Sequence, residues 1–193
     1  HDHHFGHKNQ GSPDLLVQKC RELGLGCDII PKVEISGITV SSSYIRRLVE
    51  LGQIDRANRY LGHPHILTST VLHGRGIGSS RLFPTANLAI PPHVLVPSHG
   101  VYVTRVTLAD GSAYPAVTNV GTRPTVDNGS DVTVEACLLD FEGDLYGQPI
   151  RLEYFQHIRD EIRFDSLDAL KAQIAADVET TRRVFLSGEI NSP

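Results

Sequence analysis

The sequence predicts a mainly β protein, in which a closed or nearly closed antiparallel barrel ends on a helix and follows a small α/β segment. Two observations predict the barrel. Between residues 63 and 187, short runs rich in β-branched and aromatic residues are each bounded by Gly, Pro, Asp or Asn. Few helical stretches separate these runs, as is typical of strands that pair with their neighbours in a barrel. We therefore divide the chain into residues 1–62 and 63–187.

The first part predicts three helices and a turn. Pro13 suits the first turn of a helix that Gly24 ends, and Gly62 ends the third helix. A turn is expected at Ser36 and Gly37, between two short apolar pieces. The helices are expected at residues 13–25, 41–52 and 54–62.

The second part predicts five strands and a closing helix. The strands are expected at residues 66–74, 101–108, 114–120, 132–139 and 150–155. The helix is expected over residues 164–185, with Asp165 or Ser166 as its cap and an apolar stripe that includes Leu170 and Ile174.

Composition narrows the class of protein. Hydrophobic residues make up 40% and charged residues 21% of the chain, which is typical of a folded globular protein. The net charge of −4 argues against a surface that wraps nucleic acid. No apolar run is long enough to span a membrane and no signal peptide is recognisable, so we expect a cytoplasmic protein. Because the sequence contains no Met, we expect either a fragment or a processed chain that does not begin at a translation start.

A glycine-rich run, HGRGIGSS at residues 73–80, follows the first predicted strand. The backbone N–H groups around Gly74, Gly76 and Gly78 could bind a phosphate. The run lacks the G-K-[ST] ending of a P-loop, so a plain hairpin turn is the alternative.

The stretch FPTAN at residues 83–87 is either a turn or a pair of ligands. Residues two apart on an extended chain project to the same side, so Thr85 and Asn87 could present two hard oxygen donors together. Mg²⁺ prefers such donors when it arrives with a nucleotide. Pro84 would stiffen the entry to this pair.

Glu135 stands in the middle of a predicted strand, VTVEACLLDF. Alternation puts it on one face with Thr133, Cys137 and Leu139. A glutamate in this setting is either on a solvated face or held at a cavity. The apolar neighbours favour the cavity, and both alternatives stay open.

Four stretches together resemble one family. HGRGIGSSRLFPTANLAIPP, NVGTRPTVDN at residues 119–128, VEACLLDFEGDLYGQPIRLEYF and RFDSLDALKAQIAADVE look like the riboflavin kinase module of the bacterial bifunctional riboflavin kinase/FAD synthetases. The resemblance covers residues 63–185. It implies a six-stranded antiparallel barrel that transfers the γ-phosphate of ATP to the 5′-hydroxyl of riboflavin, giving FMN and ADP.

The resemblance also implies roles for residues. Thr85 and Asn87 would bind Mg²⁺ and phosphate, and Glu135 would be the catalytic base. The loop with Gly74, Gly76, Gly78 and Pro84 would close over the ATP phosphates. A second flap against the nucleotide and the flavin would contain Asn119, Gly121, Thr122 and Arg123.

Residues 1–62 resemble the end of the family's adenylyltransferase domain, through HDHHFG and VSSSYIRR. The H-x-G-H signature of that domain is absent from this sequence. We therefore expect FAD synthesis of the native full-length protein and not of this chain.

Two other classes of function remain as alternatives. A binding module could hold a flavin or a nucleotide without turnover, although such a module would be expected to lack Glu135 or Asn87. A small barrel could also bind single-stranded nucleic acid, but an aromatic content of 6% offers few stacking platforms. We expect small-molecule substrates, no nucleic acid and no membrane.

Overall fold

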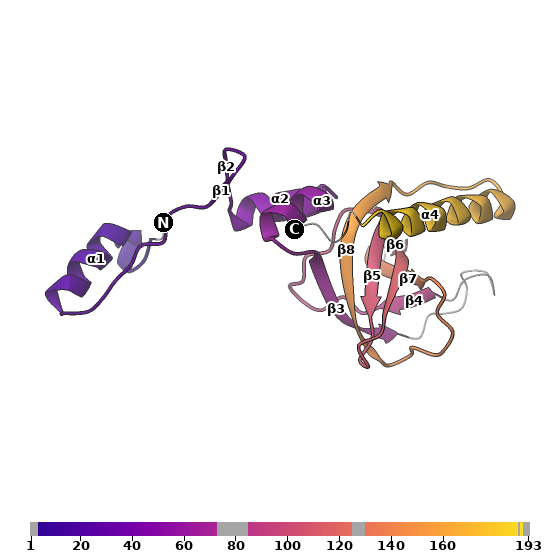
Figure 1. The fold of residues 1–193 in the computed structure, drawn as a ribbon, viewed down its shortest axis with the longest axis horizontal. Coiled ribbons are helices and arrows are strands. Elements are labelled where there is room, and N and C mark those ends of the chain that lie inside the picture. The colour runs from indigo at the N-terminus through magenta and orange to yellow at the C-terminus, as the bar shows by residue number, and fades with distance from the viewer. Residues whose placement is uncertain (1–3, 73–84, 125–129, 189, 191–193) are drawn as a thin grey trace. The chain divides into compact units, whose positions relative to one another are not determined.

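Figure 1 shows the fold of the chain in a computed structural model, which describes residues 4–72, 85–124, 130–188 and 190. The chain forms two compact units, His1–Ser41 and Ser42–Pro193.

The first unit contains little secondary structure. A 3₁₀ turn, η1 (His7–Asn9), precedes α1 (Pro13–Glu22), and a short hairpin joins β1 (Glu34–Ile35) to β2 (Ile38–Thr39). The hydroxyl of Ser12 caps α1 by accepting from the N–H of Leu15 at 3.3 Å. Ser36 and Gly37 have φ angles of 52° and 76°. Positive φ at both central residues is typical of the two-residue turn that matches the right-handed twist of the strands in a hairpin. The predicted turn is therefore confirmed.

The second unit is built on a closed barrel of antiparallel strands in the spatial order β3-β4-β7-β6-β5-β8 (Figure 1). The strands are β3 (His65–Leu72), β4 (Thr85–Leu88), β5 (Gly100–Thr107), β6 (Ala113–Pro124), β7 (Ser130–Leu138) and β8 (Pro149–Arg159). The predicted six-stranded barrel is confirmed. Every strand except β4 coincides with a predicted strand. The strand β4 falls on the FPTAN stretch, whose sequence allowed either a turn or an extended chain.

The core of the barrel follows from strand alternation. On β7, Val134, Ala136 and Leu138 are buried, as alternation predicts. Large side chains that are completely buried fill the interior from the other strands, including Tyr102, Val106, Leu152 and Tyr154.

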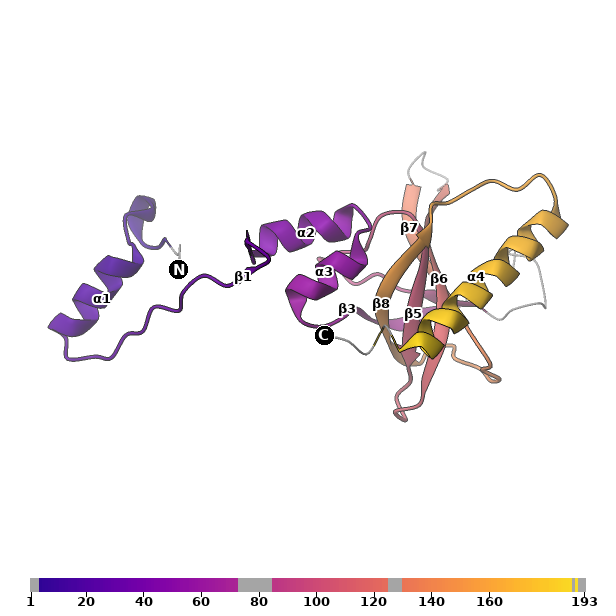
Figure 2. The ribbon, with the colours of Figure 1, turned by 45° about the horizontal axis from the view of Figure 1, so that its top comes forward.

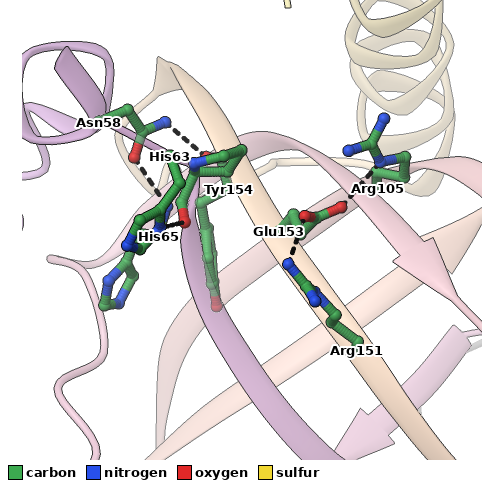
Figure 3. A network of polar contacts seen from close by, with 8 residues as sticks. Asn58, His63, His65, Arg105, Arg151, Glu153 and Tyr154 are labelled. Carbon is green, nitrogen blue, oxygen red and sulfur yellow. Dashed lines mark hydrogen bonds and ion pairs between the residues drawn. The ribbon is translucent and has the colours of Figure 1, made fainter. Parts of the chain in front are cut away.

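A helical hairpin belongs to the barrel unit. It consists of α2 (Ser42–Glu50) and α3 (Ile54–Leu61), and α3 packs against β3 and β8. Asn58 fastens the contact, because its Nδ2 donates to the Tyr154 carbonyl at 2.8 Å and its Oδ1 accepts from the N–H of His65 at 2.7 Å (Figure 3). The compact unit thus begins at Ser42, before the predicted boundary at residue 62. The descent of residues 1–62 from an adenylyltransferase domain stays a prediction.

The last helix, α4 (Leu167–Ser187), lies along the outside of β5 and β6 (Figure 2). Ser166 is its cap, since its hydroxyl accepts from the N–H of Ala169 at 3.1 Å. The helix ends at Gly188, whose φ of 73° lies in the left-handed region. Among the residues that the structure describes, no helix combines the length and the apolar character needed to cross a membrane.

Candidate active site

Three polar side chains lie side by side on the outer face of the barrel. Asn87 of β4 is the register partner of Glu135 of β7, and Glu135 is in turn the register partner of Asn119 of β6. Directly opposed residues in an antiparallel sheet have Cβ atoms about 5 Å apart. All three side chains are half-buried. We call Asn87, Glu135 and Asn119 the polar row.

Thr85 extends the site along β4. Ala86 and Leu88 are buried, whereas Thr85 is exposed and Asn87 is half-buried. The alternation of β4 therefore turns the oxygen donors of Thr85 and Asn87 to the same face, away from the barrel core.

The apolar residues that follow Glu135 on its face of the sheet pack under α4. Cys137 and Leu139 form a buried cluster with residues of β5 and β6, and Val178 of α4 packs against it. Burial raises the pKa of the Cys137 thiol to about 11, so this thiol is protonated at neutral pH. The sequence had favoured a cavity around Glu135. In the structure Glu135 lies on the outer face beside a cluster that a helix covers.

Near the end of β6, Gly121 lies two residues after Asn119. Strand alternation therefore puts both residues on the same face of the barrel. Alternation turns Thr122, which is exposed, to the opposite face, so the structure does not bring it to the polar row. The backbone of Arg123 pairs with Asp131. Gly74, Gly76, Gly78 and Pro84 lie outside the described residues.

A cavity of about 90 Å³ opens beside Thr85. The loop after β7 supplies much of its lining, including Phe141, Asp144 and Tyr146. The ring of Phe141 is held edge-on against Tyr114, with 5.2 Å between their centroids.

The same loop is anchored to α4. Arg182 donates to both carboxylate oxygens of Asp140, at 2.7 and 2.9 Å. The guanidinium lowers the pKa of the Asp140 carboxyl. Asp140 has a φ of 58°, a conformation that Asp tolerates better than most residues.

The sequence analysis quoted this loop as part of the resemblance but gave its residues no role. It did not single out Glu161, whose carboxylate accepts from Nδ2 of Asn119 at 3.2 Å. The LLDFEGDLYG run was a signal for the loop, because it is rich in turn residues and aromatics. The sequence carries no comparable signal for Glu161, because 42 residues separate it from Asn119.

The comparison with known families decides the assignment. The family described as Flavokinase: Riboflavin kinase matches residues 61–185. The chain belongs to the riboflavin kinase family. The family assignment confirms the resemblance on which the sequence analysis relied.

Two curated relatives carry riboflavin kinase in their names, and a solved structure shares the fold. Bifunctional riboflavin kinase/FMN adenylyltransferases of Pseudomonas fluorescens and Escherichia coli K12 are both 38% identical to this chain, over 94% and 95% of its length. A crystal structure described as a macrolide-efflux protein from Streptococcus pneumoniae superposes with a TM-score of 0.84 at 32% identity, over 94% of this chain and 58% of its own. The chain spans only 58% of the length of the two curated relatives.

Proposed function

We propose that this chain transfers the γ-phosphate of ATP to the 5′-hydroxyl of riboflavin at the polar row, giving FMN and ADP. The observation that supports the proposal is the sheet register, in which Glu135 is the partner of Asn87 on one side and of Asn119 on the other. Phosphoryl transfer depends mainly on positioning and on charge neutralisation, and the polar row offers one proton acceptor with neutral oxygen donors beside it.

Glu135 is the proposed catalytic base. A carboxylate in hydrogen-bond reach of the 5′-hydroxyl can accept its proton as the oxygen attacks phosphorus. Its side chain is half-buried, and Cys137, two residues further along β7, belongs to the cluster that Val178 of α4 packs against.

Thr85 and Asn87 are the proposed ligands of Mg²⁺. Their hydroxyl and amide oxygens are hard neutral donors on one face of β4, which fits a cation that brings its other ligands from water and phosphate. When bound, Mg²⁺ would neutralise charge on the transferring phosphoryl group. Thr85 also lines the cavity, so we place the nucleotide on that side, beside Phe141 and Tyr146.

The predicted flaps complete the proposal. We assign the loop with Gly74, Gly76 and Gly78 to the ATP phosphates. The segment from Asn119 to Arg123 is assigned to the second flap, against the nucleotide and the flavin.

A second activity is proposed only for the whole protein. The relatives are named as FMN adenylyltransferases as well as kinases, and residues 1–62 resemble the end of such a domain. We therefore propose that the full-length protein also adenylylates FMN to FAD, in the cytoplasm.

Removing the proposed metal ligands should weaken binding of the Mg–ATP complex. We expect Asn87→Ala and Thr85→Val each to raise the dissociation constant for ATP about tenfold in the presence of Mg²⁺, since each removes one ligand of the ion. Without Mg²⁺ the variants should bind ATP as the parent does. Calorimetric titration with ATP in both conditions checks this.

Thr68→Val is the matched control, because Thr68 is an exposed threonine on the neighbouring strand β3. It should bind ATP normally. An equal loss of ATP affinity with and without Mg²⁺ would show that Thr85 and Asn87 do not hold the metal.

A further inference from the structure

Glu161 contacts the polar row from the connector between β8 and α4. Its Oε1 accepts a hydrogen bond of 3.2 Å from Nδ2 of Asn119. We infer that Glu161 is a positioning residue of the kinase site, which holds the Asn119 amide in the orientation that presents Oδ1 to riboflavin. This inference rests on the proposed function, because it concerns the same site.

The orientation follows from the chemistry of the two groups. An ionised carboxylate has acceptor atoms only, so Glu161 must face the NH₂ group of Asn119. Oδ1 of Asn119 is then directed away from Glu161 and remains an acceptor. Riboflavin carries a chain of hydroxyl donors, and its reacting hydroxyl must approach Glu135, the register partner of Asn119. An acceptor at Asn119 is therefore placed to hold another hydroxyl of that chain.

Gly121 provides the space for this contact. Its φ is outside the left-handed region, so the backbone does not require glycine there. A Cβ at position 121 would overlap Oε1 of Glu161 and stand 3.0 Å from Nδ2 of Asn119. An alanine at position 121 would therefore displace the Glu161 carboxylate from its place beside Asn119.

The connector that carries Glu161 is fixed at its start. Arg159 donates to both carboxylate oxygens of Asp177 on α4 and, through a third nitrogen, to the carbonyl of Asp160 at 3.0 Å. Glu161 itself is exposed. Its place over Asn119 thus comes from the backbone before it, and replacing its side chain should not unfold the chain.

Glu161→Gln tests the orientation directly. Glutamine can present either an oxygen or an NH₂ group, so the Asn119 amide is no longer held one way. We expect the dissociation constant for riboflavin, measured by flavin fluorescence without ATP, to rise about tenfold, as for the loss of a hydrogen bond to a charged group. The KM for riboflavin should rise in parallel, while the KM for ATP and the melting temperature should match the parent chain. Glu179→Gln, an exposed change on α4 with the same loss of charge, should leave riboflavin binding unchanged.

Gly121→Ala gives a second test through the same contact. Alone it should weaken riboflavin binding as Glu161→Gln does. In a Glu161→Ala background, Gly121→Ala should reduce the affinity for riboflavin less than it does in the parent chain, because the carboxylate that the added methyl would overlap is gone.

Equal shifts for riboflavin and ATP, or unchanged riboflavin affinity in Glu161→Gln, would overturn the inference. A parent chain that binds riboflavin but never forms FMN would refute the proposed function alone. A parent chain that does not bind riboflavin would refute both.

Discussion

Replacing Glu135 with glutamine is expected to lower the turnover number for FMN formation roughly 10²- to 10⁴-fold, the usual contribution of a general base. Glutamine has the same size as glutamate and can hydrogen-bond to the amides of Asn87 and Asn119, but it cannot take up the proton of the 5′-hydroxyl. The affinity for ATP should stay close to that of the parent chain, because Glu135 is not a proposed ligand of the metal or the phosphates.

The measurement pairs steady-state FMN formation with ATP titration for Glu135→Gln and Asn87→Ala. Loss of turnover alone in the first variant, and loss of both properties in the second, would support the separate roles. If both variants lose turnover and ATP affinity to the same extent, the assignment of base and metal ligand is wrong. Glu179→Gln again controls for the loss of one charge.

Replacing Asp177 with alanine is expected to lower the free energy of unfolding by about 3 to 5 kcal/mol, as is usual when one partner of a buried ion pair is removed. The Asp177 side chain is 3% exposed and that of Arg159 20%. The Asp177 carboxylate also accepts from Nε2 of Gln173 at 2.9 Å, so the variant leaves the half-buried donors of Arg159 and Gln173 without their acceptor. Urea unfolding of the complete chain, followed by far-ultraviolet circular dichroism, measures the change.

A second ion pair on α4 supplies the control. Arg182 and Asp140 also form a bidentate ion pair, but their side chains are 45% and 68% exposed. Because solvent screens exposed pairs, Arg182→Ala should cost far less stability than Asp177→Ala. Equal losses in the two variants would mean that burial of the Arg159–Asp177 pair is not what stabilises the helix on the barrel.

The sequence predicted the barrel because each strand carries its own pattern. Val134, Ala136 and Leu138 alternate with more polar residues, and turn residues bound the runs. The strand β4 was ambiguous because its four residues, Thr85–Leu88, are too few for alternation to stand out between prolines. Its pairing with β7, a non-local contact, makes it a strand.

The sequence did not predict which part of the chain the helical hairpin of α2 and α3 packs against. Its buried residues, including Ile54 and Ala57, mark an apolar face, and that face predicts burial without naming its partner. The sequence placed the hairpin with the segment before it. The structure packs α3 on β3 and β8, where Asn58 bonds to both strands.

For the candidate site, the sequence indicated several of the residues but not how they lie relative to one another. Asn87 and Glu135 could be named from their residue types and from the resemblance to a family. That they are register partners, with Asn119 on the other side of Glu135, depends on strand pairing that no local pattern specifies. Glu161 depends on the connector before α4 folding back over β6, which only the tertiary structure shows.

The most direct test of the central claim is a chromatographic assay of the purified chain with riboflavin, ATP and Mg²⁺ that resolves riboflavin, FMN and FAD. We predict that FMN accumulates without FAD, and that Glu135→Gln abolishes most of this accumulation. Riboflavin that remains unchanged after prolonged incubation, although the chain binds it, would contradict the claim that this domain is a working kinase.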